Sequence, residues 1–119
     1  MRRAAKVDKN QPEIVKALRE LGVSVVDLSS VGAGCPDLLW GWRNEVGLIE
    51  IKCVGGRRDK KPVNLIDCLT PDQRKFYFMF QGPIDVCWDI DEAIAAVMQR
   101  AGDDRGVTIT KTQTVKNED

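Results

Sequence analysis

The chain has 119 residues, of which 43% are hydrophobic, and its 18 Lys and Arg side chains balance 18 Asp and Glu side chains. This composition is typical of one soluble globular domain and excludes a largely disordered chain. The sequence has no His, which excludes histidine-based acid–base catalysis. Any proton chemistry would therefore come from carboxylates, lysine, tyrosine or metal-bound water.

The N-terminal segment MRRAAKVDKN lacks the apolar region of a secretory signal, and no apolar run in the sequence is long enough to span a bilayer. We therefore expect a cytoplasmic protein with no membrane partner. The four cysteines contain no C-x-x-C pair, which favours reduced thiols over a structural zinc site.

The charges are unevenly distributed along the chain. Residues 1–20 carry six basic and three acidic side chains, and residues 51–82 carry seven basic and three acidic ones. Residues 83–119 carry four basic and eight acidic side chains. A neutral protein can therefore have a basic face, which indicates a polyanionic partner.

The first predicted element is a helix over residues 10–22. Asn10 is a suitable N-cap, Pro12 suits the first turn, and Gly22 ends the helix. Its apolar residues share one helical face: Ile14, Leu18 and Leu21. The β-branched segment 23–28 predicts a strand, and a glycine-bearing loop follows it.

A β-hairpin is predicted next, with strands over 37–42 and 46–53 joined at Arg43-Asn44. Residues 54–69 form an irregular connection. Thr70 then opens a second helix in a capping-box pattern with Gln73.

A fourth strand over 84–88 and a third helix over 91–102 follow, and residues 103–119 are either an edge strand or a polar extension. The order is helix, three strands, helix, strand, helix. It predicts an α/β fold with a mixed central sheet and helices on both faces. We expect one domain over residues 1–102.

The hairpin register places two carboxylates together. If Arg43-Asn44 is a two-residue turn, Trp42 pairs with Glu45, and counting back along both strands sets Asp37 opposite Glu50. Like charges directly opposite each other destabilise a sheet. A divalent cation between them would explain the arrangement, because Mg²⁺ takes carboxylate oxygens and substrate phosphates as ligands.

Lys52 shares the strand face of Glu50 because alternate strand residues point the same way. Its ammonium could therefore reach an attacking water or a scissile phosphate. The alternative is a structural one, in which Asp37 is only a polar residue at a strand start. Glu50-Ile51-Lys52 would then be part of a half-exposed strand.

These residues resemble a known nuclease signature. Pro36-Asp37, followed by Glu50-Ile51-Lys52 on the next strand, is similar to the PD-(D/E)xK motif. The segments GAGCPDLLWG, LIEIKC and LTPDQ resemble those of the VRR-NUC domains, in particular the stand-alone domains of phages and prophages. The resemblance covers residues 8–100 and implies a restriction-endonuclease-like αβββαβ core.

The resemblance also implies roles for individual residues. Asp37 and Glu50 would ligate a catalytic Mg²⁺ or Mn²⁺ ion, together with the backbone carbonyl of Ile51. Lys52 would orient the nucleophilic water and stabilise charge that develops on the phosphate. Glu13 and Gln73 match residues that lie at the active site in the family.

Glu13 and Gln73 each have a structural alternative. A carboxylate in a first turn complements the helix dipole, and Gln73 could be only the capping-box partner of Thr70. The basic residues of the connection are either a solvated loop or phosphate contacts beside the scissile bond: Arg57, Arg58, Lys60 and Lys61.

The expected function is that of a metal-dependent endodeoxyribonuclease, encoded by a phage or prophage and acting in the cytoplasm of a bacterial host. By analogy with Holliday-junction resolvases, we expect a homodimer that prefers junction or branched DNA. One alternative is a nickase, flap nuclease or single-strand nuclease of the same chemistry. Another is a non-catalytic DNA-binding module, and a third is a purely structural protein.

Overall fold

The computed structural model of the protein describes residues 9–53 and 62–102. Its elements follow the predicted order: α1 (Gln11–Glu20), β1 (Ser24–Asp27), β2 (Leu38–Trp42), β3 (Glu45–Ile51), the 3₁₀ turn η1 (Leu65–Cys68), α2 (Pro71–Met79), β4 (Ile84–Cys87) and α3 (Ile90–Arg100). The predicted edge strand or polar extension over 103–119 lies outside the described residues.

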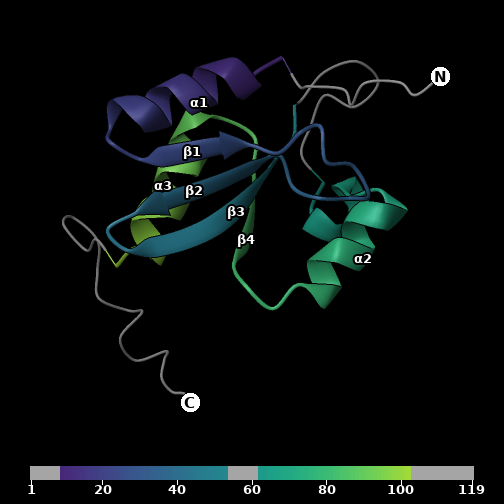
Figure 1. The fold of residues 1–119 in the computed structure, drawn as a ribbon. Coiled ribbons are helices and arrows are strands. Elements are labelled where there is room, and N and C mark those ends of the chain that lie inside the picture. Colours follow the sequence, from purple (N-terminus) through teal and green to yellow (C-terminus); the bar gives the residue numbers. More distant parts are fainter. Residues whose placement is uncertain (1–8, 54–61, 103–119) are drawn as a thin grey trace.

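The described strands form one mixed sheet in the order β1-β2-β3-β4. The pairs β1–β2 and β2–β3 are antiparallel, and β3 and β4 are parallel. The parallel pair requires a crossover connection, and α2 lies in it. The α/β prediction is confirmed, and the arrangement is compatible with an αβββαβ core (Figure 1).

The turn between β2 and β3 sets the register of the hairpin. Arg43 and Asn44 both have positive φ, 52° and 67°, as a two-residue type I′ turn requires. Trp42 pairs with Glu45, and the ladder continues back to the pair Leu38–Ile49. The predicted register is therefore confirmed, although β2 begins one residue later than expected and Asp37 lies in the bend before it.

One face of the sheet packs against α1 and α3 through apolar side chains. The core combines residues of both helices with inward residues of the strands: Ile14, Leu18, Val25, Leu38, Trp40, Ile49, Ile51, Ala93 and Val97. Leu21, which was predicted to lie on the buried face of the first helix, is 45% exposed. The reason is that α1 ends at Glu20, and Gly22 with a φ of 97° turns the chain away.

On the other face, α2 lies beside only one part of the sheet, near Glu50, Ile84 and Val86, and none of its residues is buried. Val26 and Val46 on this face are exposed. Thr70 caps this helix, and both hydrogen bonds of the predicted capping box with Gln73 are present. The loop before β2 passes directly over the first turn of α2 at Gly34. A Cβ atom at this glycine would lie 2.3 Å from the Asp72 carbonyl oxygen, so only glycine allows the approach.

β1 lies at one edge of the described sheet. A side chain from α1 reaches this edge, where Arg19 Nη2 donates a hydrogen bond of 2.8 Å to the carbonyl oxygen of Val25. In the described part of the chain, no helix has the length and apolar character needed to cross a membrane.

Candidate active site

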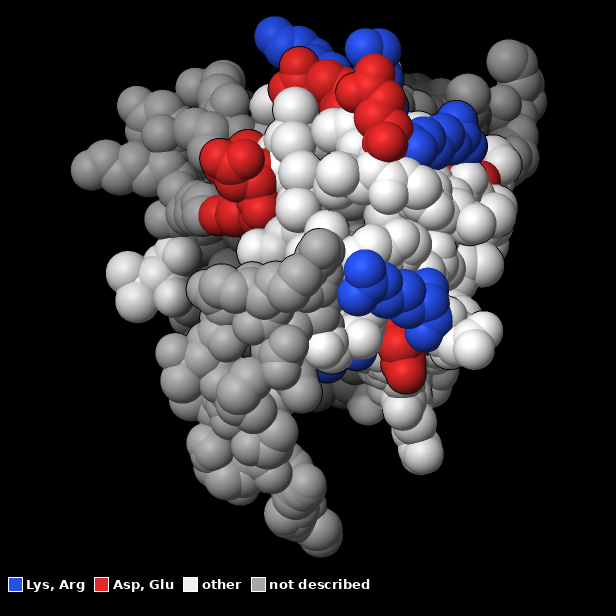
Figure 2. All heavy atoms as spheres, turned by 90° about the vertical axis from the view of Figure 1, so that its left-hand side faces the viewer, with Lys and Arg blue, Asp and Glu red and all other residues white. Residues whose placement is uncertain are grey.

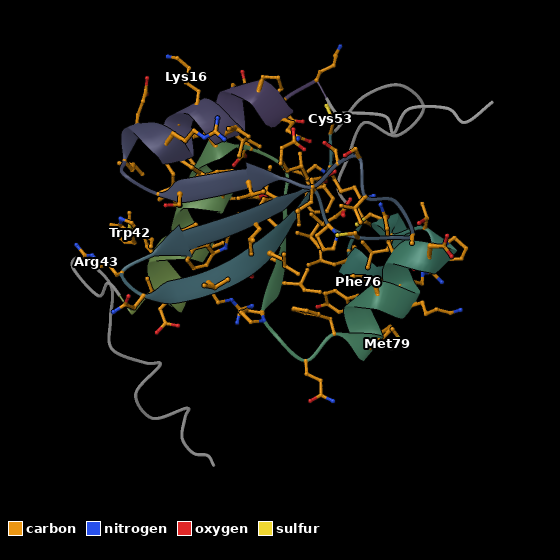
Figure 3. All side chains as sticks on the ribbon, in the orientation of Figure 1. Lys16, Trp42, Arg43, Cys53, Phe76 and Met79 are labelled. Atoms are coloured by element: carbon orange, nitrogen blue, oxygen red, sulfur yellow. The ribbon has the colours of Figure 1, made fainter. Side chains whose placement is uncertain are left out.

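The residues predicted to form a site lie at one end of the sheet. Asp37 directly precedes β2. Glu50 is the second-last residue of β3, which ends at Ile51, and Lys52 follows it. Because β2 and β3 are antiparallel, the start of one strand adjoins the end of the other. Figure 3 shows Cys53, the residue after Lys52, on the opposite side of the molecule from Trp42 and Arg43 at the hairpin turn.

Glu50 is a buried carboxylate with a cationic neighbour. The residue is only 5% exposed, and the Lys52 Nζ lies 3.5 Å from its Oε2. Burial of an unpaired charge would be costly, so the ammonium and the amide of Gln73 compensate Glu50. The predicted shared face of Glu50 and Lys52 is thus seen directly as an ion pair.

Gln73 connects α2 to both of these charged groups. Its Nε2 donates to Glu50 Oε2 at 3.1 Å, and its Oε1 accepts a hydrogen bond from Lys52 Nζ at 2.9 Å. The same Oε1 accepts the backbone N–H of Thr70 at 2.9 Å. Gln73 is therefore the capping-box partner of Thr70 and also contacts Glu50 and Lys52, while its role in catalysis stays a prediction.

Asp37 is held by the neighbouring strand. Its Oδ2 accepts a hydrogen bond of 2.7 Å from the backbone N–H of Ile51, and its carbonyl oxygen accepts the N–H of Leu28 at 2.7 Å. The side chain therefore points across to the strand end that carries Glu50 and Lys52. A carboxylate fixed by a backbone donor has a defined orientation before any ligand binds.

Cys35 lies close to both carboxylates. Burial raises the pKa of its thiol above the ordinary value, and the negative charges of Glu50 and Asp37 raise the pKa further. Sequence reasoning did not single out this residue, since its place beside the site depends on how the glycine-bearing loop folds. Cys35 remains a neutral thiol at physiological pH and adds no charge to the site.

The donor set fits a hard divalent cation such as Mg²⁺ or Mn²⁺. Carboxylate oxygens are the preferred ligands of these ions, and one or two of them suffice when water and substrate phosphates supply the rest. Asp37 and Glu50 are such a pair. Within residues 9–53 and 62–102, no group of three or more His, Cys, Asp and Glu side chains is arranged to hold a metal, so the protein would contribute only a partial ligand set.

Two further predictions concern residues outside this cluster. Glu13 is exposed in the first turn of α1, and no hydrogen bond or ion pair among the described residues links it to Asp37, Glu50 or Lys52. Its position at the helix N-terminus suits the dipole alternative, and its catalytic role remains a prediction. The predicted phosphate contacts lie outside the described residues: Arg57, Arg58, Lys60 and Lys61.

The opposite end of the molecule has a mixed surface. Figure 2 shows this end, where Lys and Arg side chains form small groups separated by neutral residues and accompanied by Asp and Glu side chains. In its described part, this face has no continuous basic surface.

Asn10 differs in part from its prediction. It is the N-cap residue of α1, as predicted, but its side chain makes no capping hydrogen bond. The amide nitrogen instead donates to the carbonyl oxygen of Lys52 at 3.1 Å and to that of Trp88 at 2.8 Å. These contacts join residues 42 and 78 positions apart, and no local sequence pattern reports pairs at such separations.

One small enclosed space lies beside the cluster among the described residues. Glu50, Gln73, Phe76 and Tyr77 border a space of only ≈ 10 Å³, which is about the volume that one water needs. A much larger cavity of ≈ 570 Å³ lies along α1 and the end of β1, and none of Asp37, Glu50 and Lys52 lines it. The enclosed space beside Glu50 is too small for a metabolite.

Comparison with known proteins adds no family to these observations: the chain matches no protein-family model, and no curated protein or solved structure is significantly similar to it. The resemblance to VRR-NUC domains therefore stays a prediction.

Proposed function

We propose that the protein is a Mg²⁺- or Mn²⁺-dependent endodeoxyribonuclease that hydrolyses DNA phosphodiester bonds. The observation that carries the proposal is the network in which Gln73 binds both Glu50 and Lys52 beside the Asp37 carboxylate. A purely structural domain has no need to place two carboxylates, an ammonium and an amide together at the end of its central strands.

The chain's own residues would divide the work. Asp37 and Glu50, with the backbone carbonyl of Ile51, would hold the cation. The cation, when bound, would supply Lewis-acid polarisation of the phosphate and a more acidic water. Lys52 would stabilise the negative charge that develops on the phosphate oxygens and orient the attacking water. Gln73 would keep the Lys52 ammonium and the Glu50 carboxylate at fixed positions through its two side-chain hydrogen bonds.

The basic residues that follow the cluster in the sequence support a polyanionic, polymeric substrate. Four basic residues follow Lys52 closely in the chain and would contact phosphates beside the scissile bond: Arg57, Arg58, Lys60 and Lys61. The preferred substrate would be branched or junction DNA. A homodimer with two-fold symmetry would present two sites to it. The enzyme would act in the cytoplasm of a bacterial host.

Cleavage by purified protein tests the proposal. Labelled junction, flap, duplex and single-stranded DNAs are incubated with the protein and Mg²⁺ or Mn²⁺, with EDTA as the metal-free control. We expect metal-dependent cleavage, fastest on the junction. If a flap, a nicked product or a single strand is preferred, the chemistry stands and the junction preference is wrong.

Lys52→Ala provides the residue-level test. Because Lys52 would act on transition-state charge, we expect the cleavage rate to fall by roughly 10²-fold or more while DNA binding is kept. Circular dichroism and the melting temperature control for folding. A well-folded variant that cleaves at the wild-type rate removes Lys52 from the mechanism. DNA binding by the wild type without cleavage under any metal condition would favour the non-catalytic binding module.

A further inference from the structure

Lys52 lies just beyond the strand that delivers it to the site. β3 ends at Ile51, which pairs with Cys87 at the end of β4. The Lys52 backbone is held by one last hydrogen bond to β4 and by one from α1. The Lys52 N–H donates to the carbonyl oxygen of Cys87 at 3.0 Å, and the Lys52 carbonyl oxygen accepts from Asn10 Nδ2 at 3.1 Å.

The Asn10 amide is a junction between three segments. The same Nδ2 atom donates to the carbonyl oxygen of Trp88, the residue after β4, at 2.8 Å. The Trp88 N–H in turn donates to Glu92 Oε1 in the first turn of α3 at 2.7 Å. The start of α1, the end of β3 and the β4–α3 connection are thereby tied together at the end of the sheet that holds the site.

The amide is used as a donor and not as a cap. Asn10 makes no side-chain capping bond, and its Oδ1 is a buried atom without a hydrogen-bond partner. An unsatisfied buried acceptor lowers stability. The two hydrogen bonds donated by the amide nitrogen are therefore the reason for an asparagine at this position. An amide NH₂ has two hydrogens for two acceptors, whereas an aspartate or serine side chain of similar size cannot donate to both carbonyls.

We infer that Asn10 is a positioning residue for Lys52: by holding the Lys52 carbonyl against Trp88, it fixes the backbone from which the ammonium reaches Glu50 and Gln73. The inference rests on the proposed nuclease function for its catalytic consequence. The hydrogen-bonded arrangement that it invokes does not depend on that function.

Asn10→Asp separates positioning from capping. Asp is as good an N-cap as Asn and favours the helix dipole, so a capping role predicts a stable and fully active variant. A positioning role predicts that kcat for DNA cleavage falls roughly tenfold while KM stays near the wild-type value. If the Asn10→Asp variant does not fold, the same measurement is made on Asn10→Ser, because serine is also a good N-cap.

The matched control is Asn64→Ala. Asn64 is exposed and its side chain accepts the Ile66 N–H at the start of η1, so this variant loses one local hydrogen bond that involves neither Lys52 nor Asn10. We expect it to cleave at the wild-type rate. A double-mutant cycle sharpens the test. In the Lys52→Ala background, Asn10→Asp should cause no further loss of cleavage, although its effect on the melting temperature should persist.

A second readout does not require cleavage. Hydrogen–deuterium exchange should become faster at the Lys52 and Cys53 amides in Asn10→Asp and Asn10→Ser, and should stay unchanged there in Asn64→Ala. Unchanged exchange at these amides in both Asn10 variants overturns the inference. If exchange accelerates but Lys52→Ala cleaves normally, Asn10 still holds Lys52 in place and it is the proposed function that fails.

Discussion

The two faces of the sheet are covered to different extents. On one face, α1 and α3 bury side chains that are fully inaccessible, such as Leu18 and Val97. On the other face, α2 buries no residue and is 70% exposed at Phe78. What joins α2 to the sheet most specifically is the Gln73 side chain, which binds Glu50 and Lys52.

The difference shows where stability and chemistry reside. Apolar burial on the α1–α3 face supplies most of the free energy of folding. The α2 side of the sheet can therefore carry buried charged groups that do not contribute to stability and that serve the candidate site. Substitutions on the two faces should consequently separate into those that unfold the protein and those that change its activity.

The largest effect is expected in the core. Leu18→Ala should lower the free energy of unfolding by about 2–5 kcal/mol, because it removes buried methyl groups and leaves a cavity. Phe78→Ala, on the exposed side of α2, should change it by no more than about 0.5 kcal/mol. Urea denaturation followed by circular dichroism measures both. Equal losses in the two variants would mean that α2 contributes to the core after all.

A smaller effect is expected where the loop crosses α2. Gly34 and Gly32 both have positive φ, 79° and 81°, so alanine at either should cost about 1 kcal/mol in backbone strain. Only at Gly34 would the new Cβ also meet the Asp72 carbonyl, at 2.3 Å. We expect Gly34→Ala to be less stable than Gly32→Ala by about 1–3 kcal/mol.

The same pair of variants reports on the site. Displacement of the first turn of α2 by Gly34→Ala would move Gln73 away from Glu50 and Lys52, so cleavage should fall more than in Gly32→Ala. Chemical denaturation and cleavage assays on both variants provide the comparison. If the two variants are equally stable and equally active, the loop at Gly34 can move to accommodate the new Cβ atom without displacing α2.

Metal binding should stabilise the wild type through Asp37 and Glu50. At a Mg²⁺ or Mn²⁺ concentration tenfold above the dissociation constant, the expected gain is about 1.4 kcal/mol. Asn at position 37 keeps an oxygen to accept the Ile51 N–H but loses the charge. Asp37→Asn should therefore abolish most of the metal-dependent rise in melting temperature, abolish cleavage, and leave the metal-free protein at least as stable as the wild type.

The outcome for Asp37→Asn is informative in either direction. Thermal melting with and without metal is measured by differential scanning fluorimetry, with EDTA-treated protein as the reference. A variant that melts much lower without metal, yet keeps the metal response and cleavage, would make Asp37 a structural residue. The active site would then lie elsewhere.

The smallest effect separates the two roles of Gln73. Thr70→Ala removes the Oγ1 atom that accepts the Gln73 N–H and should cost about 0.5–2 kcal/mol of stability with little change in cleavage. Gln73→Ala should cost a similar amount and also lower cleavage, by roughly tenfold, since Lys52 and Glu50 each lose a hydrogen bond. Matching cleavage rates in the two variants would assign Gln73 to capping alone.

The sequence predicted those features that depend on local chemistry. The two left-handed residues Arg43 and Asn44 fix the hairpin, and the alternation of strand residues then places Glu50 and Lys52 together. The element order and the mixed sheet followed from the same patterns. The capping-box pattern likewise located the start of α2 and brought Gln73 to notice.

The sequence could not predict contacts that arise from packing between distant elements. Asn10 resembles an N-cap in the sequence, and only the meeting of α1 with the ends of β3 and β4 gives its amide other partners. The sequence pattern also did not reveal that Lys52 and Gln73 already compensate the buried negative charge of Glu50. The predicted repulsion between Asp37 and Glu50 is therefore moderated in the metal-free protein.

The hydrogen bond from Arg19 to Val25 bears on self-association. β1 is an edge strand of the described sheet, and the backbone groups of an edge can pair with a strand of another molecule and start aggregation. Arg19 occupies one of these carbonyl oxygens and places a positive charge beside it, so a second chain would have to displace the guanidinium before it could pair. We therefore expect Arg19 to disfavour pairing of this edge with a second chain.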